Sequence, residues 1–165
     1  MEQKELPSDM VAYLAGVPKE STQFEFFIGD WDCETKRFDP FSGKVVAEYS
    51  GYWHAEYLFD KRVVFDTFTR YSPTGEEAGV GIQVRTFCPS SNQWEMTQID
   101  AHQPRTFSPF NAKWEDDEMK LSADCDGWSF RGRFYDIQES SWKWEGEAGK
   151  DDKWAPMIRV IASRR

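Results

Sequence analysis

The residue with the clearest chemical potential is a histidine on a predicted strand. His54 has Tyr52 and Glu56 two residues before and after it, so all three share one face of that strand. An imidazole near a carboxylate can act as a general acid or base close to neutral pH. The competing interpretation is a rim or surface histidine without a chemical role, and the sequence leaves both open.

A second candidate is a pair of oppositely charged residues on strands that could be neighbours. Asp66 and Arg85 could orient a polar group of a ligand, because a guanidinium suits a carboxylate or an enolate. The alternative is a structural salt bridge. Gln98 and Asp100 are weaker candidates for the same role of orienting a polar group of a ligand. Together with His54, Asp66 and Arg85 form the predicted catalytic set.

Metal and cofactor chemistry finds no matching motif. The chain has two histidines, and its three cysteines, at positions 33, 88 and 125, are widely spaced. Without a C-x-x-C or an H-E-x-x-H motif, we expect no zinc site. A P-loop and a G-x-G-x-x-G fingerprint are also missing. We predict no metal, no cofactor, and free thiols rather than disulfides.

Composition narrows the class of partner. The 165 residues carry a formal net charge of −9, and 16% of them are aromatic. That acidic balance argues against a nucleic-acid partner and against an anionic membrane surface. No apolar run approaches the ~20 residues of a membrane helix, and the N-terminus lacks a secretory signal. We expect a cytoplasmic protein with a small-molecule partner.

The elements that must position these residues are mostly strands. Residues 7–16 predict one short helix, and from residue 24 the hydropathy alternates with period two between turn signals. Serial hairpins favour an all-β fold, an antiparallel up-and-down β-barrel, with a β-sandwich as the competing architecture. We predict an N-terminal helical segment at 1–23 and a single barrel domain at 24–165. The predicted strands lie at residues 31–37, 44–57, 63–71, 80–87, 94–99, 112–114, 120–125, 128–135, 141–147 and 154–162.

Alternation along these strands also predicts an aromatic cavity wall. The residues expected to bind a ligand there are Trp53, Phe65, Trp94, Gln98, Phe130 and Trp144. Trp53 and His54 are adjacent and point to opposite faces, so both can line one wall only across a bulge. An apolar loop at 101–111 could act as a lid over the mouth.

Several segments in order resemble a known family. The motif FFIGDW at 26–31 resembles the G-x-W opening of calycin barrels, the lipocalins and their relatives, in which an arginine packs on the Trp. Here that arginine would be Arg159 or Arg164. Four longer segments resemble the DUF1579-like group of lipocalin-like proteins: FEFFIGDWDCETKRFDPFSG, GYWHAEYLFDKRVVFDTF, VRTFCPSSNQWEMTQID and SWKWEGEAGKDDKWAPMIRVIASRR. The resemblance implies a calycin-like barrel with a cavity and no established activity. Because some calycin barrels bind haem, haem ligation by His54 is a further option.

Three functions fit these features. The first is a protein that binds a small hydrophobic or amphiphilic molecule in the barrel. The second is a cofactor-free enzyme of the cyclase, isomerase or pericyclase type, which gains rate by positioning such a molecule. The third is an interaction protein without a cavity. The aromatic content would also permit a homodimer.

Overall fold

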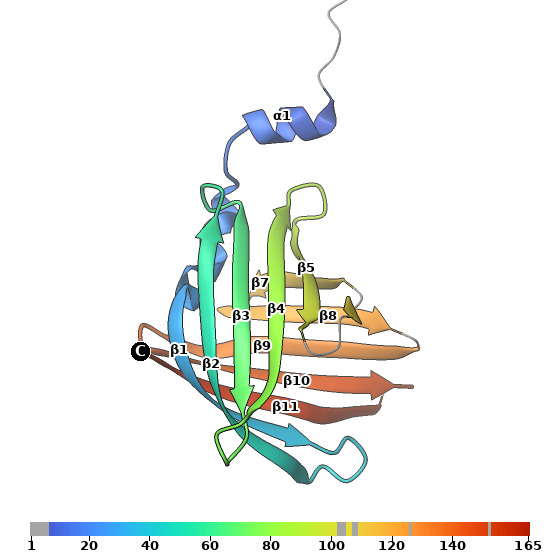
Figure 1. The fold of residues 1–165 in the computed structure, drawn as a ribbon. Coiled ribbons are helices and arrows are strands. Elements are labelled where there is room, and N and C mark those ends of the chain that lie inside the picture. The colour runs from blue at the N-terminus through green and yellow to red at the C-terminus, as the bar shows by residue number, and fades with distance from the viewer. Residues whose placement is uncertain (1–6, 102–104, 107–108, 126, 152) are drawn as a thin grey trace, which may run out of the picture.

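The computed structural model describes residues 7–101, 105–106, 109–125, 127–151 and 153–165, and shows a closed β-barrel preceded by a helical segment (Figure 1). The helical elements are the α-helix α1 (Ser8–Leu14) and the 3-10 helix η1 (Lys19–Phe27). The strands are β1 (Gly29–Phe38), β2 (Val45–Leu58), β3 (Val63–Tyr71), β4 (Glu77–Cys88), β5 (Gln93–Asp100), β6 (Arg105–Thr106), β7 (Phe110–Glu115), β8 (Glu118–Cys125), β9 (Trp128–Gln138), β10 (Ser141–Lys150) and β11 (Lys153–Arg164).

The barrel is a ring of antiparallel strands joined in sequence. β1 to β5 pair in order, β5 continues to β7, and β7 to β11 pair in order. The ring closes where β11 pairs with β1. The short strand β6 pairs with β5 beside this ring. The predicted antiparallel barrel is therefore confirmed, and closure removes the exposed sheet edges that a β-sandwich would retain.

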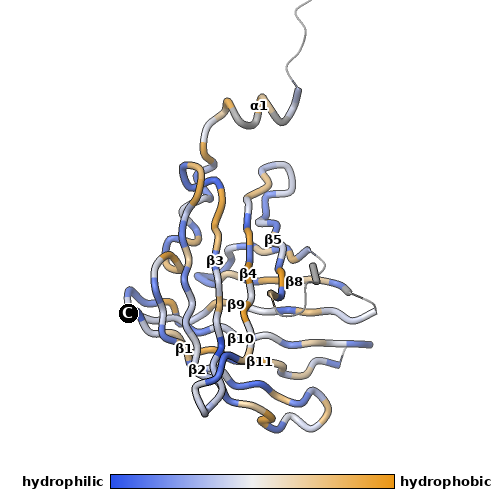
Figure 2. Tube along the Cα trace, in the orientation of Figure 1, coloured by the Kyte–Doolittle hydropathy of each residue, from blue (hydrophilic) through white to orange (hydrophobic). Residues whose placement is uncertain are grey.

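Strict alternation of side chains builds the core of the barrel. Along β1, Trp31, Cys33 and Thr35 are buried while the residues between them are exposed. The hydropathy changes repeatedly along the strands in the same way (Figure 2). One side chain in two therefore points into the barrel, as the pleat of a strand requires.

The 3-10 helix η1 closes one end of the barrel and was not predicted. Its buried residues are Ser21, Phe24 and Phe27, spaced three apart as the three residues per turn of a 3-10 helix require. The Phe24 ring centroid lies 4.8 Å from that of Trp94, and the Phe27 centroid 5.3 Å from that of Phe134. The helix spans the predicted boundary between residues 23 and 24. Through these ring contacts both phenylalanines belong to the barrel core.

Trp31 ties this end of the barrel together. It is 0% exposed, and its indole N–H donates to the Phe27 carbonyl oxygen at 2.7 Å. The Arg164 guanidinium carbon lies 4.2 Å from the Trp31 ring centroid. Arg159 instead lies over Phe38. Of the two arginines that the resemblance offered, Arg164 makes the contact, because it is the direct register partner of Trp31 across β1 and β11.

The helix α1 lies outside this compact arrangement. Figure 1 shows it beyond the barrel end on the far side of η1. Met10, Val11 and Leu14 are 48%, 52% and 66% exposed, so these three apolar side chains of the predicted helix remain largely open to solvent. In the described part of the chain, neither helix has the length and hydropathy that a membrane crossing needs.

Candidate ligand-binding cavity

A cavity of about 640 Å³ occupies the barrel interior between the closed end and the opposite mouth. Its size falls within the range of roughly 300–1,000 Å³ that small-molecule sites occupy. Most of the surrounding side chains are apolar or aromatic, with a few polar groups among them. The lining includes Arg37, Phe41, Trp53, Phe68, Arg70, Gly81, Gln83, Arg85, Met96, Gln98, Asp100, Phe110, Trp128, Phe130, Phe134, Trp144, Ala148, Met157 and Ile158.

Arg85 lines the cavity at its closed end and forms a buried ion pair with Asp66 behind it. Arg85 on β4 and Asp66 on β3 are both 0% exposed, and their side chains contact each other. The Trp53 indole N–H donates to the second oxygen of Asp66 at 2.6 Å. The Arg85 guanidinium carbon also lies 5.0 Å from the ring centroid of Phe27. The pair therefore joins two strands of the wall to the helix that closes the barrel.

Electrostatics explain why these two charges occur together. Burial lowers the pKa of the Arg85 guanidinium, because a charged group loses hydration inside the barrel. The adjacent Asp66 carboxylate opposes this effect by favouring the charged form. Removing either partner would leave an uncompensated charge in an apolar surrounding, which is strongly unfavourable.

The mouth of the cavity lies at the end where β1 and β3 finish and β9 starts. Arg37 and Arg70 occur one residue before the ends of β1 and β3, and Trp128 is the first residue of β9. All three line the cavity, together with Phe41 of the β1–β2 connection. The mouth thus combines aromatic rings with two guanidinium groups.

The structure brings five of the predicted site residues to the cavity. Trp53, Gln98, Phe130, Trp144 and Arg85 all line it. The rings of Phe130 and Trp144 are stacked, with centroids 6.3 Å apart, and form part of one wall. Each of these side chains lies on the inward series of its own strand.

The other predicted residues do not line the cavity, and two of them lie on the outer face. His54 alternates with the inward Trp53 and Ala55, and Phe65 alternates with the inward Val64 and Asp66. Phe65 therefore does not lie on the expected cavity wall, and of the two alternatives for His54 the structure shows the surface position, because the period of a strand sends adjacent side chains to opposite faces. A bulge between Trp53 and His54 would have been needed, and β2 pairs with β3 continuously there.

Trp94 and Asp66 are buried but are not part of the cavity wall. Trp94 is 0% exposed and packs against Phe24, and its indole N–H donates to the Gln23 side-chain oxygen at 3.0 Å. It therefore supports the closed end beneath η1. Asp66 lies behind Arg85 with its two oxygens directed at Arg85 and Trp53.

On the outer surface, His54 belongs to a small polar cluster. Its Nδ1 lies 2.7 Å from an Asp30 carboxylate oxygen, which also accepts a hydrogen bond from the Tyr52 hydroxyl. These bonds from Tyr52 and His54 lower the pKa of Asp30. The side chains of His54 and Asp30 are 37% and 47% exposed, so the cluster faces solvent outside the cavity.

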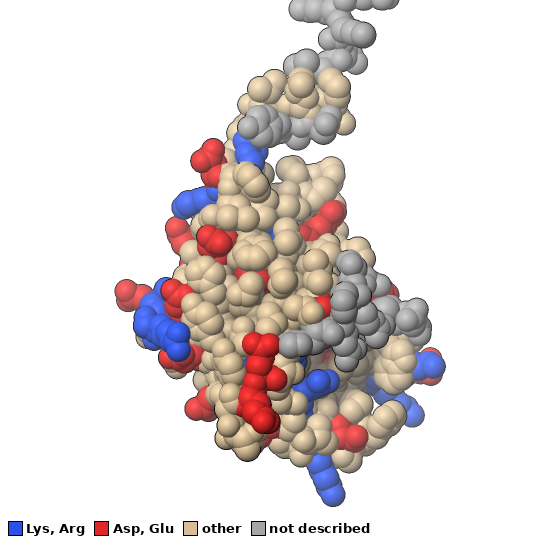
Figure 3. Space-filling view, in the orientation of Figure 1, with Lys and Arg blue, Asp and Glu red and all other residues tan. Residues whose placement is uncertain are grey.

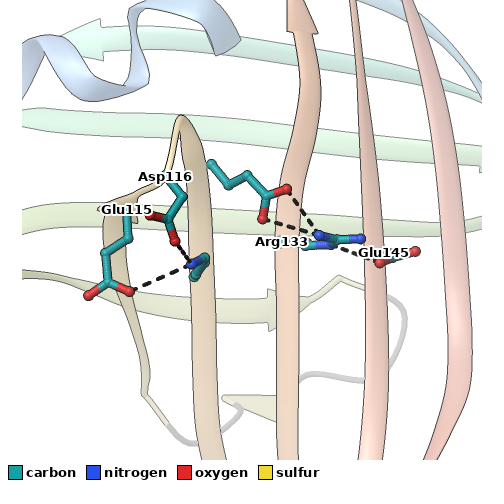
Figure 4. Close-up of polar contacts among 6 residues, drawn as sticks. Glu115, Asp116, Arg133 and Glu145 are labelled. Atoms are coloured by element: carbon teal, nitrogen blue, oxygen red, sulfur yellow. Dashed lines mark hydrogen bonds and ion pairs between the residues drawn. The ribbon is translucent and has the colours of Figure 1, made fainter.

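A second polar group on the outer face consists of paired surface charges. Arg133 binds Glu145 at 2.8 Å and Glu118 at 3.0 Å, and Lys120 binds Asp116 at 2.6 Å (Figure 4). Because these charges are at least partly exposed to solvent and already paired, they have the character of a surface ion-pair network rather than a site.

Sequence reasoning missed several cavity residues. Arg70 was not among the predicted site residues, although it shares the inward series of β3 with Asp66 and Phe68. Arg37 belongs to the inward series of Trp31, Cys33 and Thr35, which alternation along β1 could have identified. Residues 102–104 and 107–108 of the proposed lid at 101–111 lie outside the described residues, and Phe110 at its end lines the cavity.

Metal-ligating side chains do not gather in the described part of the chain. No three His, Cys, Asp or Glu residues there are placed to hold one ion. The buried thiol of Cys33 is also poorly suited to chemistry, because burial raises its pKa to about 12.

Comparison with known proteins identifies the fold. No family model and no curated protein matches the chain. The structure of Rv2717c from M. tuberculosis is similar with a TM-score of 0.64 and 9% identity, over 91% of this chain and 99% of that one. The S-type phycobiliprotein lyase CPES from Guillardia theta is similar with a TM-score of 0.62 and 10% identity, over 93% and 96%. The chain is thus a lipocalin-like antiparallel β-barrel, and its place in the DUF1579-like group stays a prediction.

Proposed function

We propose that the barrel binds a small hydrophobic or amphiphilic molecule in its interior. The observation that carries this proposal is the cavity of about 640 Å³, which is lined by aromatic and aliphatic side chains and by a few polar groups. Such a surface is poorly hydrated, so covering it with an apolar ligand is favourable. An interaction protein without a cavity does not fit this interior.

The enzyme alternative has less support from the cavity. His54, the predicted acid or base, lies outside it, and Asp66 is engaged by Trp53 and Arg85. A cyclase or isomerase would have to act mainly by holding its substrate in a reactive conformation. One structural neighbour is a phycobiliprotein lyase, and its likeness at 10% identity concerns the fold. We therefore place binding ahead of catalysis.

Other features of the proposal come from the sequence. The net charge of −9 supports the prediction that nucleic acid is not a partner. A cytoplasmic location and a homodimer remain predictions. For a dimer, the outer surface over β3 and β4 offers a largely uncharged area, with charged side chains mainly around it (Figure 3).

Filling part of the cavity should weaken binding of an uncharged fluorescent probe, N-phenyl-1-naphthylamine. Gly81 lines the cavity, and a Cβ added there would meet no atom within 4 Å. We expect Gly81→Leu to occupy space that the probe needs and to weaken its binding at least about tenfold, or ~1.4 kcal/mol. Fluorescence titration of both proteins measures the dissociation constants.

Ala78→Leu provides the matched control, because Ala78 lies on the same strand and is exposed. It should bind the probe like the wild type, and both variants should retain the wild-type circular dichroism spectrum. A wild-type protein without saturable probe binding would refute the proposed function, as would full binding by Gly81→Leu.

A further inference from the structure

We infer that the ligand carries an anionic oxyacid group, a carboxylate or a phosphate, which Arg70 binds at the mouth with Arg37 beside the same opening. This inference rests on the proposed function and adds the chemical class of the ligand. It also predicts the orientation of the ligand, with its apolar part inside and its charge at the mouth.

Arg70 provides the main observation. It lies on the inward series of β3 and lines the cavity. Its Nε is buried without a hydrogen-bond partner. Among the residues that the structure describes, the Arg70 side chain has no ion-pair or hydrogen-bond partner. An unsatisfied buried donor on a charged group is unfavourable, so a ligand that accepts from it would gain the corresponding free energy.

The neighbouring strand is shaped around this guanidinium. Gly79 is the register partner of Arg70 across β3 and β4. A Cβ added at Gly79 would come within 2.5 Å of the Arg70 Nη2, so a larger residue would displace the guanidinium. Gly81, two residues along the same inward series, leaves open space beside it. Gly79 therefore leaves room for the Arg70 guanidinium itself, and Gly81 leaves open space next to that guanidinium.

Arg37 adds a second positive charge at the same end of the barrel. It lines the cavity, and in the described part of the chain it has no ion pair. The register of β1 shifts directly after Arg37, and that of β3 directly after Arg70. Such bulges are frequent at barrel rims, where they redirect side chains.

The other charges of the cavity do not neutralise these arginines. Arg85 on the floor is paired with Asp66, and Asp100 on the wall already has an interaction of its own. The protein as a whole carries a net charge of −9, yet in the described part of the chain neither Arg37 nor Arg70 forms an ion pair with a carboxylate. A charged group of the ligand is the partner that the mouth lacks.

The geometry of a guanidinium selects the type of anion. Its planar N–H donors match the two oxygens of a carboxylate or a phosphate. The rest of the lining, with Trp144, Phe130 and Ile158, suits an apolar chain or ring system. An amphiphile with one oxyacid group fulfils both requirements.

The test compares ligands of equal chain length that differ in charge. Dodecanoate, dodecyl phosphate and dodecan-1-ol are titrated at pH 8 against the complex with N-phenyl-1-naphthylamine, and displacement gives their dissociation constants. We expect the wild type to prefer at least one anion over the alcohol by roughly tenfold or more, as a charge-assisted hydrogen bond would provide. Arg70→Gln should remove most of this preference and leave dodecan-1-ol binding unchanged.

Three further variants separate charge at the mouth from other effects. Arg70→Lys should retain part of the preference, because it keeps the charge without the planar donors. Arg37→Gln should reduce the preference less than Arg70→Gln. Arg159 is exposed on the outward series of β11. The control Arg159→Gln should therefore leave the binding of the anions and of dodecan-1-ol unchanged.

The outcomes distinguish the two proposals. If the wild type binds the alcohol and both anions equally, or if Arg70→Gln keeps the preference, this inference is overturned while the proposed function stands. If neither the probe nor any dodecyl compound binds, the proposed function itself fails. Circular dichroism of each variant shows whether the barrel is intact, and Arg70→Met, which also removes the charge, replaces Arg70→Gln if the latter does not fold.

Discussion

The ion pair of Asp66 and Arg85 shows how a single buried interaction constrains the floor of the barrel. Both side chains are 0% exposed, so neither charge can be hydrated when its partner is lost. Each also holds an aromatic neighbour, since Trp53 donates to Asp66 and the Arg85 guanidinium lies against Phe27. The role of the pair in ligand binding stays a prediction, whereas its contribution to the free energy of unfolding can be measured directly.

Breaking this pair should strongly lower the free energy of unfolding. We expect Arg85→Met to cost about 3–5 kcal/mol, because it leaves the Asp66 carboxylate buried without its cation. Adding Asp66→Asn should then cost less than the same change in the wild type, with a coupling free energy of about 1–3 kcal/mol. Urea denaturation of the wild type, both single variants and the double variant gives this value.

The exposed pair of Arg133 and Glu145 is the control for that cycle. Its members are 43% and 24% exposed and lie 2.8 Å apart. Solvent screening should limit their coupling to below about 1 kcal/mol. If both pairs gave the same coupling free energy, the expectation that burial makes the loss of an ion-pair partner more costly would be contradicted.

At the scale of elements, alternation in the sequence predicted the strands but not the face that each strand turns inward. The ten predicted strands correspond to those of the ring, since hydropathy of period two and turn signals are local properties. The choice of face is not local. Asp66 and Phe65 were both assigned to the cavity, although adjacent residues on a strand cannot share a face.

The polar partner of Asp66 resolves that choice. Asp66 can be buried only because Arg85 comes from the next strand and Trp53 from the preceding one. A sequence lists these three residues far apart, and their contact depends on the register of the strands. Judged by hydropathy alone, Phe65 was the expected inward residue. In the structure Asp66 takes the inward position, because Arg85 and Trp53 satisfy its charge.

The helix η1 was missed for a similar reason. Its pattern of Ser21, Phe24 and Phe27 has a period of three, which fits neither an α-helix nor a strand. The Phe24 and Phe27 rings are held in place by contacts with Trp94, Phe134 and Trp142, which lie on distant strands. Only the closed barrel therefore makes this short helix favourable.

The two helical elements should contribute very differently to stability. Deleting residues 1–15 removes α1, in which Met10, Val11 and Leu14 are exposed, and should change the free energy of unfolding by less than about 1 kcal/mol. Phe27→Ala removes a fully buried ring and should cost about 3–5 kcal/mol. Urea denaturation compares both with the full chain. A large loss on deleting 1–15 would show that α1 packs on the barrel.

For the whole molecule, the closed ring means that the cavity exists only when the barrel is complete. The wall of the cavity combines residues from nearly every part of the ring, from Arg37 on β1 to Ile158 on β11. Partial unfolding would open this wall and expose its aromatic side chains to water. Ligand binding and global stability should therefore be linked.

That linkage gives a prediction for the intact protein. A ligand that binds the folded state alone raises the free energy of unfolding by RT ln(1 + [L]/Kd), which is about 2.7 kcal/mol at 100 times Kd. Urea denaturation of the wild type with increasing N-phenyl-1-naphthylamine should follow this curve, with the Kd taken from the fluorescence titration. Gly81→Leu should lack the increase at the same probe concentrations, and Ala78→Leu should show it in full. If probe fluorescence saturates while the stability of the wild type stays constant, the probe binds outside the barrel interior, because only a site destroyed by unfolding produces this linkage.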